Sequence, residues 1–136
     1  MAVTIPDRIK DLLERPIVVA LATTMADNTP QATPVWFNWD GERIWINTAR
    51  GRAKDDNMTE RPNVSILSVD PSNPYRYLEV RGIVDEITED GAVDHINFLS
   101  ARYRNQPDYY GADLERKARE TRVIYKIRPT RVLAHD

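Results

Sequence analysis

The sequence predicts one mainly β domain in which antiparallel strands close into a β-barrel with flanking helices. Short segments of alternating or β-branched apolar residues recur along the chain, and turn residues such as Asp40-Gly41 separate them. Strands joined by short hairpins favour a closed barrel. A chain of 136 residues can bury one hydrophobic core but not two, so residues 1–136 are expected to form a single domain.

The chain is expected to begin with a short helix. Thr4, followed three residues later by Asp7, can cap this helix, which ends before Pro16. Its predicted apolar stripe consists of Ile5, Ile9, Leu12 and Leu13.

Three antiparallel strands are expected next. Ile17–Thr23 and Gln31–Trp39 form a first hairpin through the turn residues Asp27–Pro30. The dipeptide Asp40-Gly41 then predicts a tight turn into a third strand, Arg43–Thr48.

The rest of the chain is expected to alternate between loops, helices and strands. The polar segment Ala49–Arg61 predicts a loop and a short helix that Pro62 ends. The expected later elements are a strand Asn63–Val69, a rigid loop Asp70–Pro74, a long strand Tyr75–Ile87, a helix marked by Ala92, Ile96, Leu99 and Tyr103, a loop Gln106–Ala112, a polar helix Asp113–Glu120, and strands Thr121–Ile127 and Thr130–Ala134 broken at Pro129.

Composition excludes several classes of function. A formal net charge of −2, from 19 basic and 21 acidic residues, provides no overall field that would attract nucleic acid or anionic lipid. The apolar run Ile17–Ala22 is far shorter than the roughly 20 residues that span a bilayer, and no secretion signal precedes it, so a cytoplasmic protein is expected. The chain has no cysteine, and neither His95 nor His135 has a partner at ligand spacing, so no metal site is predicted.

The segment Asn47–Lys54 is the strongest candidate for a binding site. It places Arg50, Arg52 and Lys54 around Gly51, at the end of a strand and beside an expected helix start. Phosphate groups bind where freed backbone N–H groups, a helix N-terminus and cationic side chains meet. The alternative from the pattern alone is a solvated basic loop, balanced by the acidic residues Asp55, Asp56 and Glu60.

Two aromatic segments are further candidates. Tyr75-Arg76-Tyr77 opens the long strand, where rings can flank a planar ligand and the arginine can pair with an acidic group. Trp36 follows Pro34-Val35 and can lie along such a ligand. The alternatives are cross-strand pairing for the tyrosines and core packing for Trp36.

Four stretches of the chain, in order, resemble the pyridoxamine 5'-phosphate oxidase-like split-barrel proteins, and specifically their deazaflavin (coenzyme F420)-dependent oxidoreductase branch. The stretches are Ala20-Leu21-Ala22-Thr23, Pro30–Trp36, Asn47–Lys54 with Asn57, and Asn73–Gly82. This resemblance implies a six-stranded antiparallel split β-barrel of the FMN-binding type, which forms a homodimer with the cofactor at the subunit interface.

The resemblance also implies a set of cofactor-binding residues. Arg52, Lys54 and Asn57 would hold the phosphate and acidic tail, the segment Thr33–Trp36 would run along the ring system, and Tyr75–Tyr77 would reach in from the other subunit. The implied set is Thr33, Pro34, Val35, Trp36, Asn47, Thr48, Ala49, Arg50, Arg52, Lys54, Asn57, Tyr75, Arg76 and Tyr77. No side chain is assigned as a catalytic acid or base.

The function that the resemblance implies is transfer of a hydride from reduced coenzyme F420 to a small conjugated or enone-type substrate. The alternatives are an FMN-binding oxidase-like enzyme and a non-catalytic protein that binds a cofactor or a tetrapyrrole-like ligand. The cations Arg50 and Arg76 slightly favour the deazaflavin, because its anionic tail extends beyond the phosphate at which FMN ends. A nucleic-acid-binding barrel is disfavoured by the negative net charge.

Overall fold

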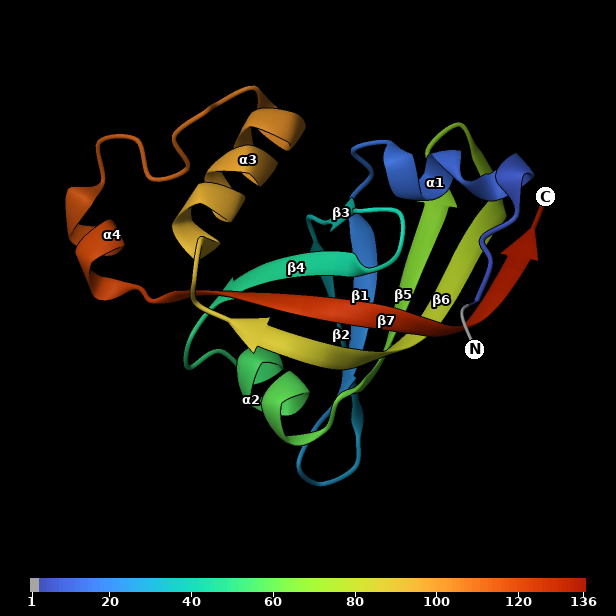
Figure 1. Cartoon of the computed structure of the whole chain (residues 1–136), viewed down its shortest axis with the longest axis horizontal. Coiled ribbons are helices and arrows are strands. Elements are labelled where there is room, and N and C mark those ends of the chain that lie inside the picture. The colour runs from blue at the N-terminus through green and yellow to red at the C-terminus, as the bar shows by residue number, and fades with distance from the viewer. Residues whose placement is uncertain (1–2) are drawn as a thin grey trace.

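A curled antiparallel sheet forms the body of the protein in the computed structural model, which describes residues 3–136 (Figure 1). Residues 1 and 2 of the expected domain lie outside the described part. Every neighbouring pair of strands is antiparallel, in the order β2-β1-β5-β6-β7-β4-β3. The strands are β1 (Val19–Thr24), β2 (Pro30–Val35), β3 (Asn38–Trp39), β4 (Ile44–Ala49), β5 (Asn63–Asp70), β6 (Asn73–Thr88) and β7 (Arg122–His135).

The two edge strands of this sheet are neighbours in the chain. Only Trp36 and Phe37 separate β2 from β3. Because consecutive Cα atoms are about 3.8 Å apart, the last Cα of β2 and the first Cα of β3 lie within roughly 11 Å of each other. The sheet must therefore curl back on itself. This confirms the predicted mainly β, split-barrel fold.

The sheet has seven strands instead of the six that the resemblance implies, and the expected strand Gln31–Trp39 is broken into β2 and β3. The backbone N–H of Phe37 donates to the Tyr103 hydroxyl at 3.2 Å instead of to a neighbouring strand. After this break Asn38 and Trp39 pair with β4 on the opposite edge of the sheet.

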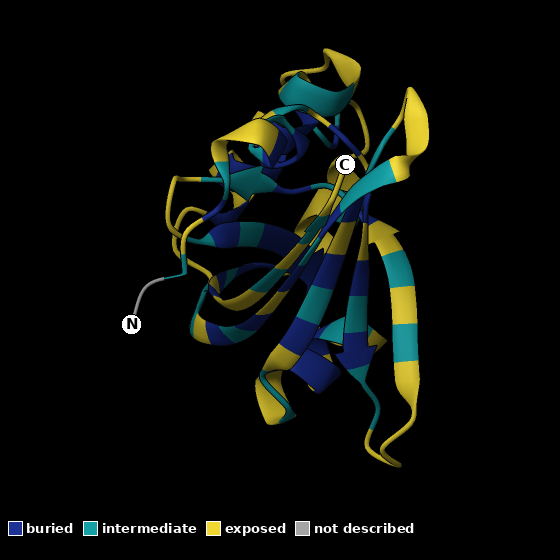
Figure 2. Cartoon of the chain, turned by 90° about the vertical axis from the view of Figure 1, so that its right-hand side faces the viewer, coloured by how far each residue is buried: buried dark blue, intermediate teal, exposed yellow. Residues whose placement is uncertain are grey.

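The core lies inside the curl, and inward-facing residues alternate with outward-facing ones along the strands (Figure 2). The N-terminal segment covers one end of it. The expected stripe of Ile5, Ile9, Leu12 and Leu13 is buried. The helix itself differs from the prediction. A 3₁₀ turn, η1 (Asp7–Ile9), precedes α1 (Asp11–Glu14), and Pro6 occupies the N-cap position of η1 with no side-chain cap from Thr4.

The predicted break at Pro129 is wrong, because β7 is continuous. Arg131 pairs with Arg81 and Pro129 pairs with Gly82, so Thr130 is unpaired in the strand register and forms a bulge, where its hydroxyl donates to the Arg81 carbonyl at 3.3 Å. Proline lacks a backbone N–H and is tolerated in a sheet at such irregularities. The expected loop Asp70–Pro74 is shorter than predicted, because β6 begins at Asn73.

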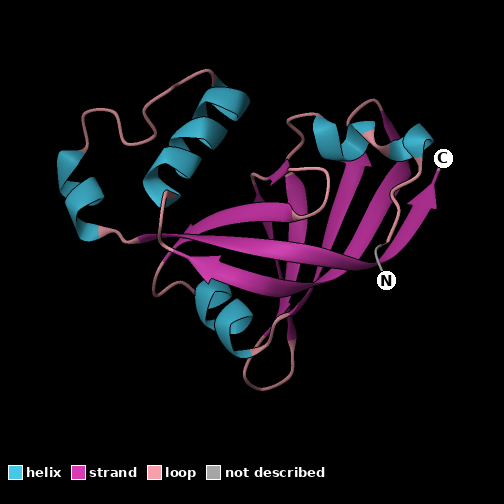
Figure 3. Cartoon of the chain, in the orientation of Figure 1, coloured by secondary structure: helices cyan, strands magenta, loops and turns pink. Residues whose placement is uncertain are grey.

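Three further helices lie around the sheet, and each coincides with an expected helix: α2 (Ala53–Glu60), α3 (Ala92–Arg104) and α4 (Leu114–Arg119). Helices α3 and α4 lie near one end of the sheet, on the left in Figure 3, and Arg102 of α3 donates to the Glu14 carbonyl of α1 at 3.0 Å. Within residues 3–136, none of the helices combines the length and apolar character that a membrane crossing requires.

Candidate functional site

A cavity of about 330 Å³ lies where β2, β4, the start of α2 and the apolar face of α3 meet. This volume is at the lower end of the range for small-molecule sites. Its lining residues are Val18, Pro34, Val35, Trp36, Asn47, Arg52, Lys54, Ile96, Leu99, Tyr109 and Arg122. The fold therefore brings together six of the predicted residues, namely Pro34, Val35, Trp36, Asn47, Arg52 and Lys54.

One wall of the cavity is cationic and only partly compensated. Arg52 Nη2 and Arg122 Nη1 both contact the carboxylate of Glu120, at 3.1 and 3.2 Å. Lys54 has no ion pair with any residue in the described part of the chain. Burial, followed by the nearby charges of Arg52 and Arg122, lowers the pKa of Lys54 from its usual value. Three cations thus face one carboxylate, which is the electrostatic environment of an anion site.

The start of α2 adds backbone donors to this wall. Gly51 has a φ of 89°, a left-handed conformation that glycine adopts without strain, and it leads into Arg52 at the N-cap. Arg52 offers no side-chain cap, so N–H groups in the first turn of α2 remain available to another acceptor. Such N–H groups at a helix N-terminus, next to cationic side chains, suit a phosphate.

The facing wall is aromatic. The Trp36 ring stacks on Tyr103, with centroids 5.3 Å apart and planes 11° apart, and meets the edge of Tyr109 at 6.1 Å. The Tyr103 hydroxyl donates to the Ile17 carbonyl at 2.6 Å and so fixes this stack. The guanidinium of Arg122 lies 5.2 Å from the Tyr109 ring centroid and joins the two walls. The cavity therefore offers a planar ligand ring aromatic surfaces to pack against, next to a positively charged side of the cavity.

Several lining residues were not predicted as site residues. Ile96 and Leu99 were expected only as the helix stripe, and Tyr109 lies in a segment predicted simply as a loop. Glu120, which contacts two cations of the wall, was expected only as the end of a polar helix. For Tyr109 the sequence did hold one signal, the adjacent pair Tyr109-Tyr110, because two consecutive aromatic residues in a loop need a surface to pack against.

Five predicted residues in the first half of the chain do not line the cavity. Thr48 and Ala49 are buried in β4, and Thr33 lines a separate groove on the outer face of the sheet. Arg50 pairs with Asp55 at 3.1 Å and with Glu89 at 3.0 Å. Asn57, 3% exposed, donates to Thr23 Oγ1 at 2.9 Å and accepts from Arg61 at 3.2 Å. The contacts of Asn57 therefore attach α2 to β1.

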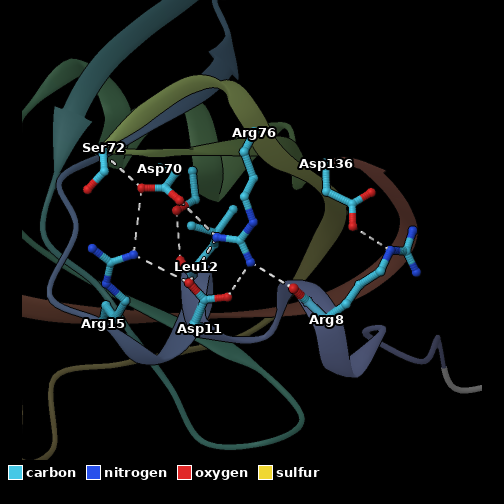
Figure 4. Close-up of polar contacts among 9 residues, drawn as sticks. Arg8, Asp11, Leu12, Arg15, Asp70, Ser72, Arg76 and Asp136 are labelled. Carbon is cyan, nitrogen blue, oxygen red and sulfur yellow. Dashed lines mark hydrogen bonds and ion pairs between the residues drawn. The ribbon is translucent and has the colours of Figure 1, made fainter.

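The segment Tyr75–Tyr77 lies away from the cavity of its own chain. Arg76 donates to Asp11 at 2.6 Å, to Asp70 at 3.0 Å and to the Arg8 carbonyl at 2.7 Å (Figure 4). These contacts join the N-terminal helix to the β5–β6 turn. Tyr75 is 78% exposed, and Tyr77 stacks on His135 with ring centroids 5.3 Å apart.

The chain belongs to the pyridoxamine 5'-phosphate oxidase family, whose profile matches residues 5–136. Among solved structures it is similar to an F420 reductase, with 38% identity and a TM-score of 0.81 over 95% of this chain and 98% of that one. These matches confirm the resemblance predicted from the four motifs, both to the split-barrel family and to its F420-dependent branch.

Two further structures share the fold. A conserved hypothetical protein from Mycobacterium tuberculosis is 25% identical, with a TM-score of 0.77 over 99% of this chain and 86% of that one. General Stress Protein 26 from Bacillus anthracis is 22% identical, with a TM-score of 0.69 over 96% of this chain and 92% of that one. A sequence search of curated proteins found no match.

Proposed function

We propose that this protein is an oxidoreductase that binds reduced coenzyme F420 in the cavity between Trp36 and Lys54 and transfers a hydride to a small conjugated or enone-type substrate. The observation that carries the proposal is Lys54, which has no ion pair within residues 3–136, beside Arg52 and Arg122 and opposite an aromatic wall. The similarity to an F420 reductase supports the choice of cofactor.

The residues of the cavity fit the chemistry of this cofactor. Val35 and Trp36 would lie along the planar ring system, and Arg52, Lys54 and the first turn of α2 would hold the phosphate. When bound, the deazaflavin supplies the two-electron hydride chemistry, and the protein supplies binding and orientation. The buried residues Ile96 and Leu99 exclude water from the side of the cavity under α3. We assign no catalytic acid among the lining residues.

A homodimer is part of the proposal. The outer face of the sheet presents a groove lined mainly by apolar side chains from β1, β2 and β5, and two of its residues, Val18 and Pro34, also line the cofactor cavity. Val18 is 54% exposed and Leu67 is 38% exposed. A second copy seated on this face would bury apolar surface at roughly 25 cal/mol for each Å². In the dimer that the resemblance implies, the segment Tyr75–Tyr77 of one copy would reach the cavity of the other.

FMN is the second candidate cofactor. Arg50 and Arg76 favoured the longer anionic tail of the deazaflavin in the sequence, but both are engaged by carboxylates of their own chain. The cations that line the cavity, Arg52, Lys54 and Arg122, are compensated only by the shared carboxylate of Glu120, and they suit one phosphate group, which both cofactors carry. The preference for F420 therefore depends on the similarity to the reductase.

The test is a pair of equilibrium titrations with oxidised coenzyme F420 and with FMN, followed by quenching of the three tryptophans and by cofactor fluorescence. We expect tighter binding of F420. Reduced F420 mixed with a cyclic enone should then regain the absorbance of the oxidised cofactor only when the protein is present. Tighter binding of FMN would select the oxidase-like alternative. Binding without turnover on any enone or conjugated acceptor would select the non-catalytic alternative.

A further inference from the structure

A buried hydrogen-bond chain runs from the cavity wall into the protein through Arg122, Asn47, His95 and Asn38. Arg122 Nε donates to Asn47 Oδ1 at 2.9 Å, and Asn47 Nδ2 lies 3.1 Å from His95 Nδ1. His95 Nε2 lies 2.6 Å from Asn38 Oδ1. Arg122 and Asn47 line the cavity, whereas His95 lies behind them on α3 and does not line it.

The partners of this hydrogen-bond chain fix the orientation of every group in it. Arg122 Nε can only donate, so the oxygen of the Asn47 amide faces it and Asn47 Nδ2 donates to His95 Nδ1, which leaves the ring proton on Nε2, facing Asn38 Oδ1. The second N–H of the Asn47 amide donates to the Ala92 carbonyl at 2.8 Å. Both donors of the Asn47 amide are thereby used, and its oxygen is turned toward Arg122. A flipped Asn47 amide would place N–H against N–H at Arg122 and leave His95 Nδ1 facing an oxygen.

Arg122 is held at two of its five N–H groups. Nε donates to Asn47 and one Nη1 proton contacts Glu120 at 3.2 Å, and its side chain is only 3% exposed. Within residues 3–136 Arg122 forms no further well-aligned hydrogen bond, although the Tyr110 hydroxyl lies close to its guanidinium. A buried guanidinium with unused donors that lines a cavity is suited to bind an anionic group there.

We propose that His95 is a positioning residue, which orients the unused donors of Arg122 toward the ligand in the cavity by fixing the amide of Asn47. The inference rests on the proposed function in one respect: the ligand is an anionic flavin-like cofactor. His95 itself touches neither the cavity nor the ligand. It acts by restricting Asn47 to one of its two amide orientations.

Burial supports this assignment. His95 is 7% exposed, and burial, together with the nearby charges of Lys126 and Arg122, lowers its pKa to about 4. The imidazole is therefore neutral at pH 7, as acceptance at Nδ1 requires.

The first experiment needs no cofactor. In ¹⁵N NMR spectra of the uniformly labelled protein at pH 7, we expect His95 as the neutral tautomer protonated at Nε2. We also expect an Arg122 Nε–H that exchanges slowly with water. The Nδ1-protonated tautomer or the charged ring would overturn the inference.

Variants of His95 then separate positioning from packing. In His95→Asn the amide oxygen can occupy the δ position of the ring and accept from Asn47, whereas His95→Leu offers no acceptor. We expect the slow exchange of Arg122 Nε–H to persist in His95→Asn and to be lost in His95→Leu. Equal exchange in all three proteins would contradict the inference. Val93→Ala, at a 38% exposed site on the same helix and outside the hydrogen-bond chain, is the matched control.

Binding measurements test whether this orientation serves the ligand. With oxidised F420 as the probe, or with FMN if that binds more tightly, we expect about a tenfold or greater increase in Kd for His95→Leu and for Arg122→Leu. The double variant should lose little more than either single one, because both act through one guanidinium. Fully multiplicative losses would contradict positioning. If the wild-type protein binds neither cofactor, the proposed function fails, whereas the NMR result still decides whether His95 orients Arg122.

Discussion

Lys54→Met should weaken cofactor binding without destabilising the free protein. Methionine keeps an unbranched stem of similar length and removes the charge. A hydrogen bond to a charged group contributes about 1.5–3 kcal/mol, which corresponds to an increase in Kd for F420 of about 10- to 150-fold. In the free protein Lys54 has no ion pair within residues 3–136, and Arg52 and Arg122 oppose its charge. The free energy of unfolding of Lys54→Met should therefore be equal to that of the wild type or slightly higher.

The assay combines F420 titration by fluorescence with urea unfolding of the free protein. Lys117→Met, at an exposed position of α4 outside the cavity, removes the same charge and should leave both quantities unchanged. The reasoning is refuted if Lys54→Met binds F420 as tightly as Lys117→Met does. It is also refuted if Lys54→Met unfolds at lower urea than the wild type, because that would mean the charge has a stabilising partner.

Three other perturbations test separate parts of the structure. Burial lowers the pKa of His95 from 6.5 to about 4. Between pH 6.5 and pH 4 the unfolded chain therefore binds a proton at this residue that the folded chain does not bind, so the folded protein becomes less stable as the pH falls. From pH 7 to pH 4 the wild type should lose up to about 3 kcal/mol more unfolding free energy than His95→Gln in urea titrations, and parallel pH profiles would contradict this. A Cβ at Gly82 would lie 2.6 Å from Ile127 Cγ2. Gly82→Ala should therefore lower the free energy of unfolding by about 1–3 kcal/mol in the same assay. Unchanged stability would mean that the contact between β6 and β7 is looser than described. Leu67→Arg should convert the proposed dimer to a monomer in sedimentation experiments, and an unchanged mass would place the dimer interface elsewhere.

Local patterns were sufficient to predict most of the fold. Alternation in β4 and β5, the turn at Asp40-Gly41 and the helical spacing of α3 are properties of neighbouring residues, and the corresponding elements form where expected. The break after β2 could not be predicted in this way, because it depends on Tyr103, 66 residues away from Phe37. The continuous β7 likewise depends on a bulge opposite β6, and not on Pro129 alone.

The lining of the candidate site was predictable where its chemistry is concentrated in one segment. Arg52 and Lys54 stand together in the sequence at a helix start, and both line the cavity. Arg76 has the same residue type, but Asp11, 65 residues away, engages it, so its charge is used within its own chain. Tyr109 lines the cavity because the segment between α3 and α4 folds against Trp36; the pair Tyr109-Tyr110 indicates that this segment packs against a surface, but not which one.

The most direct test of the central claim is a crystal structure of the protein with oxidised coenzyme F420. We expect the ring system against Trp36 and the phosphate in contact with Arg52, Lys54 and the first turn of α2. A cofactor bound instead in the larger cavity of about 670 Å³ beside Trp39 and Arg43, with Lys54 still unpaired, would contradict the assignment.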